Sequence, residues 1–211
     1  MARATLVAAL LLVLGPASPV GADSWPGPRV VTVFSEDGGR FVRIVPGASV
    51  GDTVGFAGAP RGAYARGAFY ARQPDRSYRL VADVPLANPV APVEALVSNG
   101  GHLLTLDNWH NLGHGPVVAV YDPSGSLLRS YRLEDLYDAK RLASIPASVS
   151  SRWWRCAASG FVDPPAQTKV YVNERLGGTF VVTLATAAIA YQAGAAPCPA
   201  AGAPFSATFH P

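Results

Sequence analysis

The chain has 211 residues, of which 49% are hydrophobic and only 15% are charged, so an intrinsically disordered or highly charged protein is excluded. The length allows one domain with a substantial core or two small ones. The formal net charge is +3, and arginine supplies 15 of the 17 basic residues, which together with abundant alanine, glycine and proline indicates a GC-rich bacterial source.

The first 22 residues have the layout of a secretory signal peptide. Arg3 provides a short positive region, residues 6–14 are a purely apolar run, and Val20-Gly21-Ala22 is a small-residue cleavage site. The apolar run is much shorter than the ~20 residues that a transmembrane helix needs. We therefore expect a secreted or periplasmic protein without a transmembrane segment after cleavage, whose residues 23–211 form a single β domain.

Three stretches of this domain share a pattern of strands and turns. Short apolar runs punctuated by Gly, Pro, Asn and Asp predict an all-β protein. A Gly-Gly pair precedes an apolar run in each stretch, and Asp-Gly or Asn-Gly at such a position is typical of a two-residue hairpin turn. The predicted units are residues 29–86, 91–133 and 148–191. The predicted strands are 30–34, 41–45, 68–71 and 78–84 in the first unit, 93–97, 102–106, 117–121 and 127–133 in the second, and 148–154, 168–173 and 179–187 in the third.

The second unit resembles one blade of a β-propeller. It fits four strands into 43 residues, with glycines at its first turn and a Tyr121-Asp122-x-x-Gly125 string at its third. The resemblance implies about three four-stranded antiparallel units of this kind. Because closed propellers have about four to eight blades, it implies an open or incomplete propeller. A β-sandwich built from repeat-like hairpins explains the same pattern and remains the alternative.

The connection between the second and third units, residues 134–147, contains one predicted helix. Leu136, Leu142 and Ile145 lie at helical spacing, and Pro146 ends the pattern. The helix is therefore short, and the rest of the domain is expected to be strands and loops.

Cys156 and Cys198 are the two cysteines of the chain. In an exported protein an even pair predicts one disulfide, with free thiols or partners outside the chain as the alternatives. The bridge would close a loop of about 40 residues and contribute roughly 3–4 kcal/mol. It would also tie the Pro/Ala-rich tail, residues 192–211, to the body of the domain.

The connections of a four-stranded unit alternate between the two ends of its sheet. The tight Gly-Gly and Pro-Ser-Gly turns fall at one end, and the long connections fall at the other: residues 46–63, 86–92, 107–116 and 134–147. Function on a rigid scaffold concentrates in loops, so the long-loop face is the candidate site. The candidate ligand-binding residues, all in one loop, are Asp107, Asn108, Trp109, His110 and His114.

Two other interpretations of this loop stay open. His102, Asp107, His110 and His114 form a candidate metal-ligand set for a metal-assisted hydrolase that uses residues 102–114. Gly113 and Gly115 exclude the helix on which two histidines four apart would share a face. The same loop also suits a purely structural turn, in which Asp107 and Asn108 accept backbone N–H bonds and Trp109 covers the end of the core.

The sequence therefore favours an exported binding or scaffold protein for an unidentified protein or small-molecule ligand. No catalytic residue, no cofactor and no nucleic-acid partner is predicted. The Gly-x-Ser-x-Gly match at residues 47–51 lacks the strand-turn-helix context of a hydrolase nucleophile. The arginines of residues 61–79 predict a solvated face, with a polyanion-binding patch as the alternative. Open sheet edges offer a route to self-association.

Overall fold

The computed structural model describes residues 25–49, 62–148, 150–194 and 198. The predicted signal peptide, most of the loop at residues 46–63 and nearly all of the tail at residues 192–211 lie outside the described residues. Among the described residues, no helix is both long and apolar enough to cross a membrane.

The described chain forms three four-stranded sheets and two short helices. Each sheet is a meander of four consecutive antiparallel strands, and none of the three is closed. The first sheet contains β1 (Val31–Phe34), β2 (Arg40–Val45), β3 (Arg66–Arg72) and β4 (Tyr78–Pro85). The second contains β5 (Pro92–Val97), β6 (Leu103–Asn108), β7 (Val118–Tyr121) and β8 (Leu127–Tyr131). The helices α1 (Leu133–Leu136) and α2 (Ala139–Ala143) follow. The third sheet contains β9 (Arg155–Phe161), β10 (Lys169–Glu174), β11 (Gly178–Thr183) and β12 (Ala188–Ala193). This confirms the predicted all-β class with three four-stranded antiparallel units.

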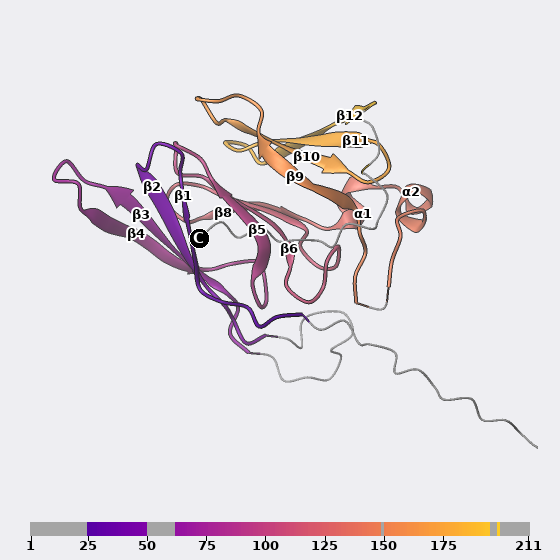
Figure 1. Ribbon diagram of the computed structural model, residues 1–211, viewed down its shortest axis with the longest axis horizontal. Coiled ribbons are helices and arrows are strands. Elements are labelled where there is room, and N and C mark those ends of the chain that lie inside the picture. The colour runs from indigo at the N-terminus through magenta and orange to yellow at the C-terminus, as the bar shows by residue number, and fades with distance from the viewer. Residues whose placement is uncertain (1–24, 50–61, 149, 195–197, 199–211) are drawn as a thin grey trace, which may run out of the picture.

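The second sheet is the middle layer of the molecule, between the first and the third (Figure 1). Every residue of β6 and β7 is buried, because a separate apolar core covers each face of this sheet. One core joins it to the first sheet and includes Val42, Ile44, Phe69, Leu103 and Tyr121. The other joins it to the third sheet and includes Leu104, Val118, Trp154, Val172 and Phe180. A strand covered on both faces has no polar side to alternate with, which explains why Leu103-Leu104-Thr105-Leu106 is nearly all apolar.

The third unit departs from the prediction at both of its ends. The predicted opening strand at residues 148–154 is wrong, because β9 begins only at Arg155. Trp154 instead enters the core before the strand starts. The predicted last strand, residues 179–187, is too long, since β11 ends at Thr183 and a turn follows in which Ala187 has φ +54°; the next strand, β12, begins at Ala188. No Gly, Pro, Asn or Asp marks this turn, so the composition carried no signal for it.

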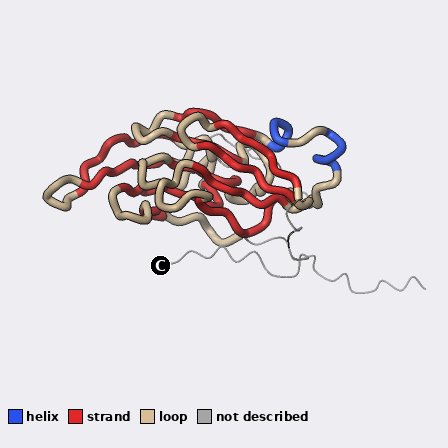
Figure 2. The backbone as a smooth tube through the Cα atoms, turned by 90° about the horizontal axis from the view of Figure 1, so that it is seen from above, coloured by secondary structure: helices blue, strands red, loops and turns tan. Residues whose placement is uncertain are grey.

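The predicted helix at residues 134–145 is split into α1 and α2 (Figure 2). Tyr137 has an extended backbone with ψ 143°, which ends α1. Asp138 then caps α2 by accepting a hydrogen bond from the backbone N–H of Arg141 at 2.8 Å. The spacing of the leucines predicts the helical region correctly. Asp138, an N-cap residue within that region, begins a second helix.

A buried glutamine links the first hairpin turns of all three sheets. Gln167 donates from Nε2 to Glu36 Oε2 at 2.6 Å, and its Oε1 accepts from the backbone N–H of Asn99 at 2.7 Å. The Asn99 side chain in turn accepts from the backbone N–H of Asp37 at 3.1 Å. These contacts gather the tight turns at one end of the molecule, which leaves the long connections for the other end.

Candidate ligand-binding loop

The long connections meet at the end of the sheets opposite these turns. The backbone N–H of Gly47 donates to Val90 O at 2.7 Å, and that of Trp109 donates to Ala91 O at 2.9 Å. Arg152, which precedes β9, donates its backbone N–H to Leu112 O at 2.8 Å. Segments far apart in the sequence therefore build one continuous surface around the loop at residues 107–116.

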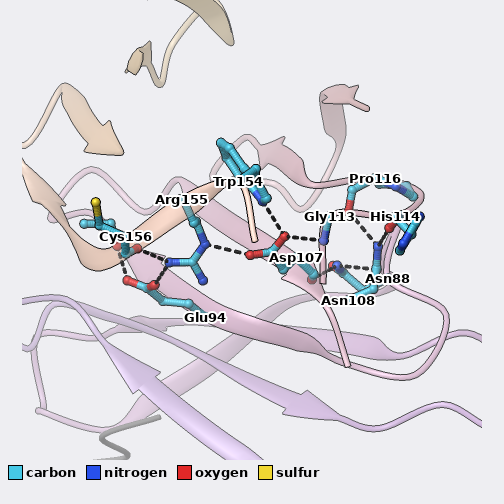
Figure 3. A network of polar contacts seen from close by, with 11 residues as sticks. Asn88, Glu94, Asp107, Asn108, Gly113, His114, Pro116, Trp154, Arg155 and Cys156 are labelled. Atoms are coloured by element: carbon cyan, nitrogen blue, oxygen red, sulfur yellow. Dashed lines mark hydrogen bonds and ion pairs between the residues drawn. The ribbon is translucent and has the colours of Figure 1, made fainter. Parts of the chain in front are cut away.

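Asp107 holds this loop from inside. It lies at the end of β6 with φ +59° and is only 1% exposed. Its Oδ1 accepts hydrogen bonds from the Trp154 indole N–H at 2.7 Å and from the backbone N–H of Gly113 at 3.0 Å. Its Oδ2 accepts from Arg155 Nε at 2.6 Å, and all three donors converge on the carboxylate in Figure 3. One side chain thus fastens β6, the loop and the start of β9 together.

Arg155 extends the same network across to β5. Its side chain is 2% exposed, and Nη1 donates to Glu94 Oε2 at 2.8 Å. Ser159, four residues after Arg155 in β9, donates its hydroxyl to the other carboxylate oxygen of Glu94. Burial disfavours a charged guanidinium, but the negative charges of Asp107 and Glu94 outweigh it, so the pKa of Arg155 is raised. The second and third sheets are therefore joined by a buried ion-pair network as well as by apolar contacts.

Two asparagines close the loop on itself. Asn108 donates from Nδ2 to the carbonyl oxygens of His114 at 2.6 Å and Pro116 at 2.8 Å. Asn88 donates to the backbone oxygen of Asp107 and to Oδ1 of Asn108, both at 2.9 Å. Both asparagines are buried. Their side chains therefore do not contact solvent, and their hydrogen bonds fix the path of the loop.

Trp109 anchors the outer side of the loop. Its ring is buried in a small apolar cluster, and its indole N–H donates to Pro26 O at 3.0 Å. The ring of Trp25 meets it edge-on at a centroid distance of 5.6 Å. Of the five predicted ligand-binding residues, Asp107, Asn108 and Trp109 are therefore buried and bonded within the chain.

The remaining two, His110 and His114, are only half-buried and reach the surface. Arg152 and Trp153 are also half-buried; the charge of Arg152 acts on His114, and Trp153 packs against the apolar cluster that contains Trp109. A small hollow, partly open to solvent and with room for about one water molecule, is lined by Asp107, Leu112, Arg152, Trp153, Trp154 and Arg155. Within the described part of the chain, the buried Nε of Arg152 and Nε2 of His114 have no hydrogen-bond partner. The surface of the loop therefore combines two imidazoles, a guanidinium and an indole, and it lies over residues that are buried and hydrogen-bonded within the chain.

The structure does not bring the candidate metal ligands together. His102 precedes β6 and lies near the carboxylate of Asp122, in the tight turn between β7 and β8. Asp107 and His110 lie at the opposite end of β6. Five residues of strand separate two positions by about 16 Å. Both oxygens of Asp107 already accept hydrogen bonds. Among the described residues there is no group of three or more His, Cys, Asp or Glu side chains placed to hold a metal ion.

We expect the protein to lose stability as the pH falls below about 6.5, the usual value for histidine. Burial lowers the pKa of His102, His110 and His114, and the nearby charge of Arg152 lowers that of His114 further. The unfolded chain therefore takes up protons first on acidification, and the free energy of unfolding falls until the folded pKa values are passed. Thermal unfolding midpoints at pH 7.5 and pH 5.5 measure this, and replacing the three histidines by glutamine should flatten the difference. Equal midpoints in the native chain would contradict the expectation.

Several residues that hold the candidate loop in place could not be predicted from the sequence. Asn88 and Glu94 are isolated polar residues in apolar stretches, and Arg155 follows Arg152-Trp153-Trp154. The roles of all three depend on partners from other parts of the chain. The usable signal was an arginine placed where β9 begins, since a buried charge requires a partner. The partner itself, 48 residues away in the chain, could not be read from spacing.

A second buried carboxylate fastens α1 and α2 to the third sheet. Glu174, at the end of β10, is 0% exposed and accepts hydrogen bonds from the hydroxyls of Tyr137 at 3.0 Å and Tyr191 at 2.9 Å. Arg141 of α2 also donates to Glu174 and lies over the ring of Tyr191. Burial and the charge of Glu174 raise the pKa of Tyr137. The cluster holds the residue 134–147 connection in place beside the long-loop face.

The cysteine prediction is confirmed, because Cys156 and Cys198 form a disulfide across a sequence separation of 42 residues. Cys156 lies in β9, next to the buried Arg155. The bridge therefore fastens Cys198 to the strand that carries the network.

No family model matches this chain, and neither a curated protein nor a solved structure matches it. The inference of function consequently depends on the geometry of the chain's own residues.

Proposed function

We propose that the chain is an exported binding or scaffold protein that recognises its ligand with the long-loop face. The observation that supports this is the contrast within one loop. Asp107, Asn108 and Trp109 are buried and bonded within the chain, while His110 and His114 reach the surface, and Arg152 lies near His114. Binding loses least free energy when the binding loop is already ordered, and a loop braced in this way is ordered before any ligand arrives.

The proposal extends to architecture and location. The three meanders would be propeller-like blades in an open array, since each has four antiparallel strands and the sheets follow one another in chain order. The predicted leader and the disulfide support an oxidising, extracytoplasmic location. A rigid three-sheet body with long loops collected at one end suits a protein that presents a surface rather than one that encloses a substrate.

A binding screen with paired variants tests the proposal. The purified chain is incubated with arrayed oligosaccharides and peptides, and each hit is measured again with Arg152→Ala and His110→Ala. Both side chains are half-buried, and the loop's own hydrogen bonds to Asp107 and Asn108 do not use them. We expect at least one ligand whose binding is lost in either variant while the thermal midpoint stays within a few degrees, as for a surface substitution.

Lys169→Ala is the matched control, because Lys169 is exposed on β10 in the third sheet, away from the loop. It should retain every ligand. If no arrayed compound binds, or if bound compounds ignore the loop variants, the loop face is a structural end of the sheets and the proposal fails.

A further inference from the structure

The first sheet has one face in the core and one face open to solvent. Its inner face carries Val42, Ile44 and Phe69, which pack against the second sheet. The strand register places Phe34 opposite Phe41, Phe41 opposite Tyr70 and Tyr70 opposite Leu80. Side chains alternate between faces along a strand, so this row points away from the core. In Figure 1 the first sheet is the outermost layer on its side of the stack.

The open face is unusually apolar for a solvated surface. Nine large hydrophobic side chains are exposed among the described residues, and five of them belong to the first unit: Val30, Phe34, Tyr64, Tyr78 and Leu80. Phe34 is 54% exposed and Leu80 is 47% exposed, one on each edge strand. Contiguous exposed apolar groups usually mark a site of interaction.

The aromatic rings of this face hold one another in place. Phe41 stacks on Tyr70 at a centroid distance of 4.4 Å, and Phe34 lies 4.9 Å from Phe41 on the other side. Tyr78 meets Phe41 edge-on at 4.8 Å, and its hydroxyl donates to Gly38 O at 2.6 Å. The rings therefore form an ordered apolar row across the sheet rather than four independent side chains.

Two arginines flank this row. Arg43 follows Phe41 by two positions in β2, and Arg72 follows Tyr70 by two positions in β3, so both lie on the open face. Both are exposed, and within the described part of the chain neither forms an ion pair. A third arginine, Arg66, is neutralised by Asp83 at 3.0 Å. The face therefore carries an apolar centre with a net positive charge.

We propose that this open face, made of Phe34, Phe41, Tyr70, Tyr78, Leu80, Arg43 and Arg72, binds an anionic lipid surface. Guanidinium groups form strong hydrogen bonds with phosphate, and their aliphatic stems lie along apolar surface while the charge stays at the headgroups. The apolar row gains free energy when it leaves water for the boundary between headgroups and acyl chains.

Other partners use this face less well. A nucleic acid stacks on aromatic rings, but it offers nothing to the aliphatic Leu80. A standard protein interface takes roughly 20–30 residues from each side, whereas the outward positions of these four strands number about a dozen. An anionic membrane needs only apolar contact and positive charge, which are the two properties that the face combines.

Vesicle flotation tests the proposal. The chain, purified after export, is mixed with vesicles of phosphatidylcholine alone or with about one third phosphatidylglycerol, and the bound fraction is measured as lipid is added. We expect binding to the anionic vesicles, weakened by salt, and little binding to the neutral ones. Arg43→Gln with Arg72→Gln should weaken binding about 25-fold, or about fivefold for each arginine. Phe34→Ser with Leu80→Ser should weaken it at least tenfold.

Two matched controls keep the result specific. Leu128→Ser removes an exposed leucine from β8, and Lys169→Gln removes an exposed cation from β10. Both should bind as the native chain does, and circular dichroism should show every variant folded. Equal binding to neutral and anionic vesicles, or no loss in either paired variant, overturns the proposal. Absence of vesicle binding overturns it as well and leaves the face to a protein partner.

Discussion

Replacing Asp107 by alanine is expected to lower the free energy of unfolding by about 3–5 kcal/mol, the range for breaking a buried ion pair. The substitution leaves the Arg155 guanidinium charged and buried, with Glu94 as its remaining acidic contact. It also removes the acceptor for the Trp154 indole N–H and for the backbone N–H of Gly113. Urea unfolding followed by tryptophan fluorescence measures the loss.

Two comparisons separate the buried charge from other effects of the change. Asp83→Ala also breaks an arginine–aspartate pair, but both partners are about half exposed, so a loss below about 1 kcal/mol is expected. Asp107→Asn keeps a hydrogen-bond acceptor and removes the charge, and it should fall between the two. If Asp107→Ala were no more costly than Asp83→Ala, the network would not be what joins the second and third sheets.

Reduction of the Cys156–Cys198 disulfide is expected to destabilise the protein by about 4 kcal/mol. The bridge spans 42 residues, and closing a loop of this length removes conformational entropy from the unfolded chain that corresponds to about 4 kcal/mol at 25 °C. The fold should survive at room temperature, because both apolar cores form without the bridge. The urea midpoint of the native chain with and without dithiothreitol measures the effect.

The double variant Cys156→Ser with Cys198→Ser should match the reduced native chain and show no further response to dithiothreitol. Each single variant should behave in the same way, apart from disulfide-linked dimers formed by the remaining thiol. An unchanged urea midpoint after verified reduction would show that the unfolded chain is constrained by other means.

Much of the fold could be predicted because its signals are local. Glycines at positive φ begin or end hairpins at Gly38, Gly101 and Gly177, where side chains with a Cβ are strained. Short apolar stretches between turn residues marked β2 and β3, and a nearly continuous apolar run marked β6. The start of the third unit could not be predicted from the sequence. Trp153-Trp154 is typical of a strand, whereas Trp154 lies in the core before β9 begins.

The sequence indicates the loop at residues 107–116 as a candidate site, but it does not indicate which residues of the loop are buried. The loop at residues 107–116 contains all five candidate residues, and the structure divides them into three buried supports and two half-buried histidines. Sequence spacing cannot make this division, because burial of Asp107 depends on Arg155 and Trp154 from another sheet. The open aromatic face was also hidden, since its row crosses four strands and joins Phe34 to Leu80 through register alone.

The sequence by itself determined the properties that neighbouring residues decide: an all-β chain, its hairpin turns, and one disulfide, because two cysteines allow only one pairing within the chain. The tertiary structure decided which polar residues are buried, how the three sheets stack, and which sheet face remains open. The physical reason is that hairpin geometry depends on a few consecutive backbone angles, whereas burial and charge pairing depend on residues that meet only after the sheets have packed.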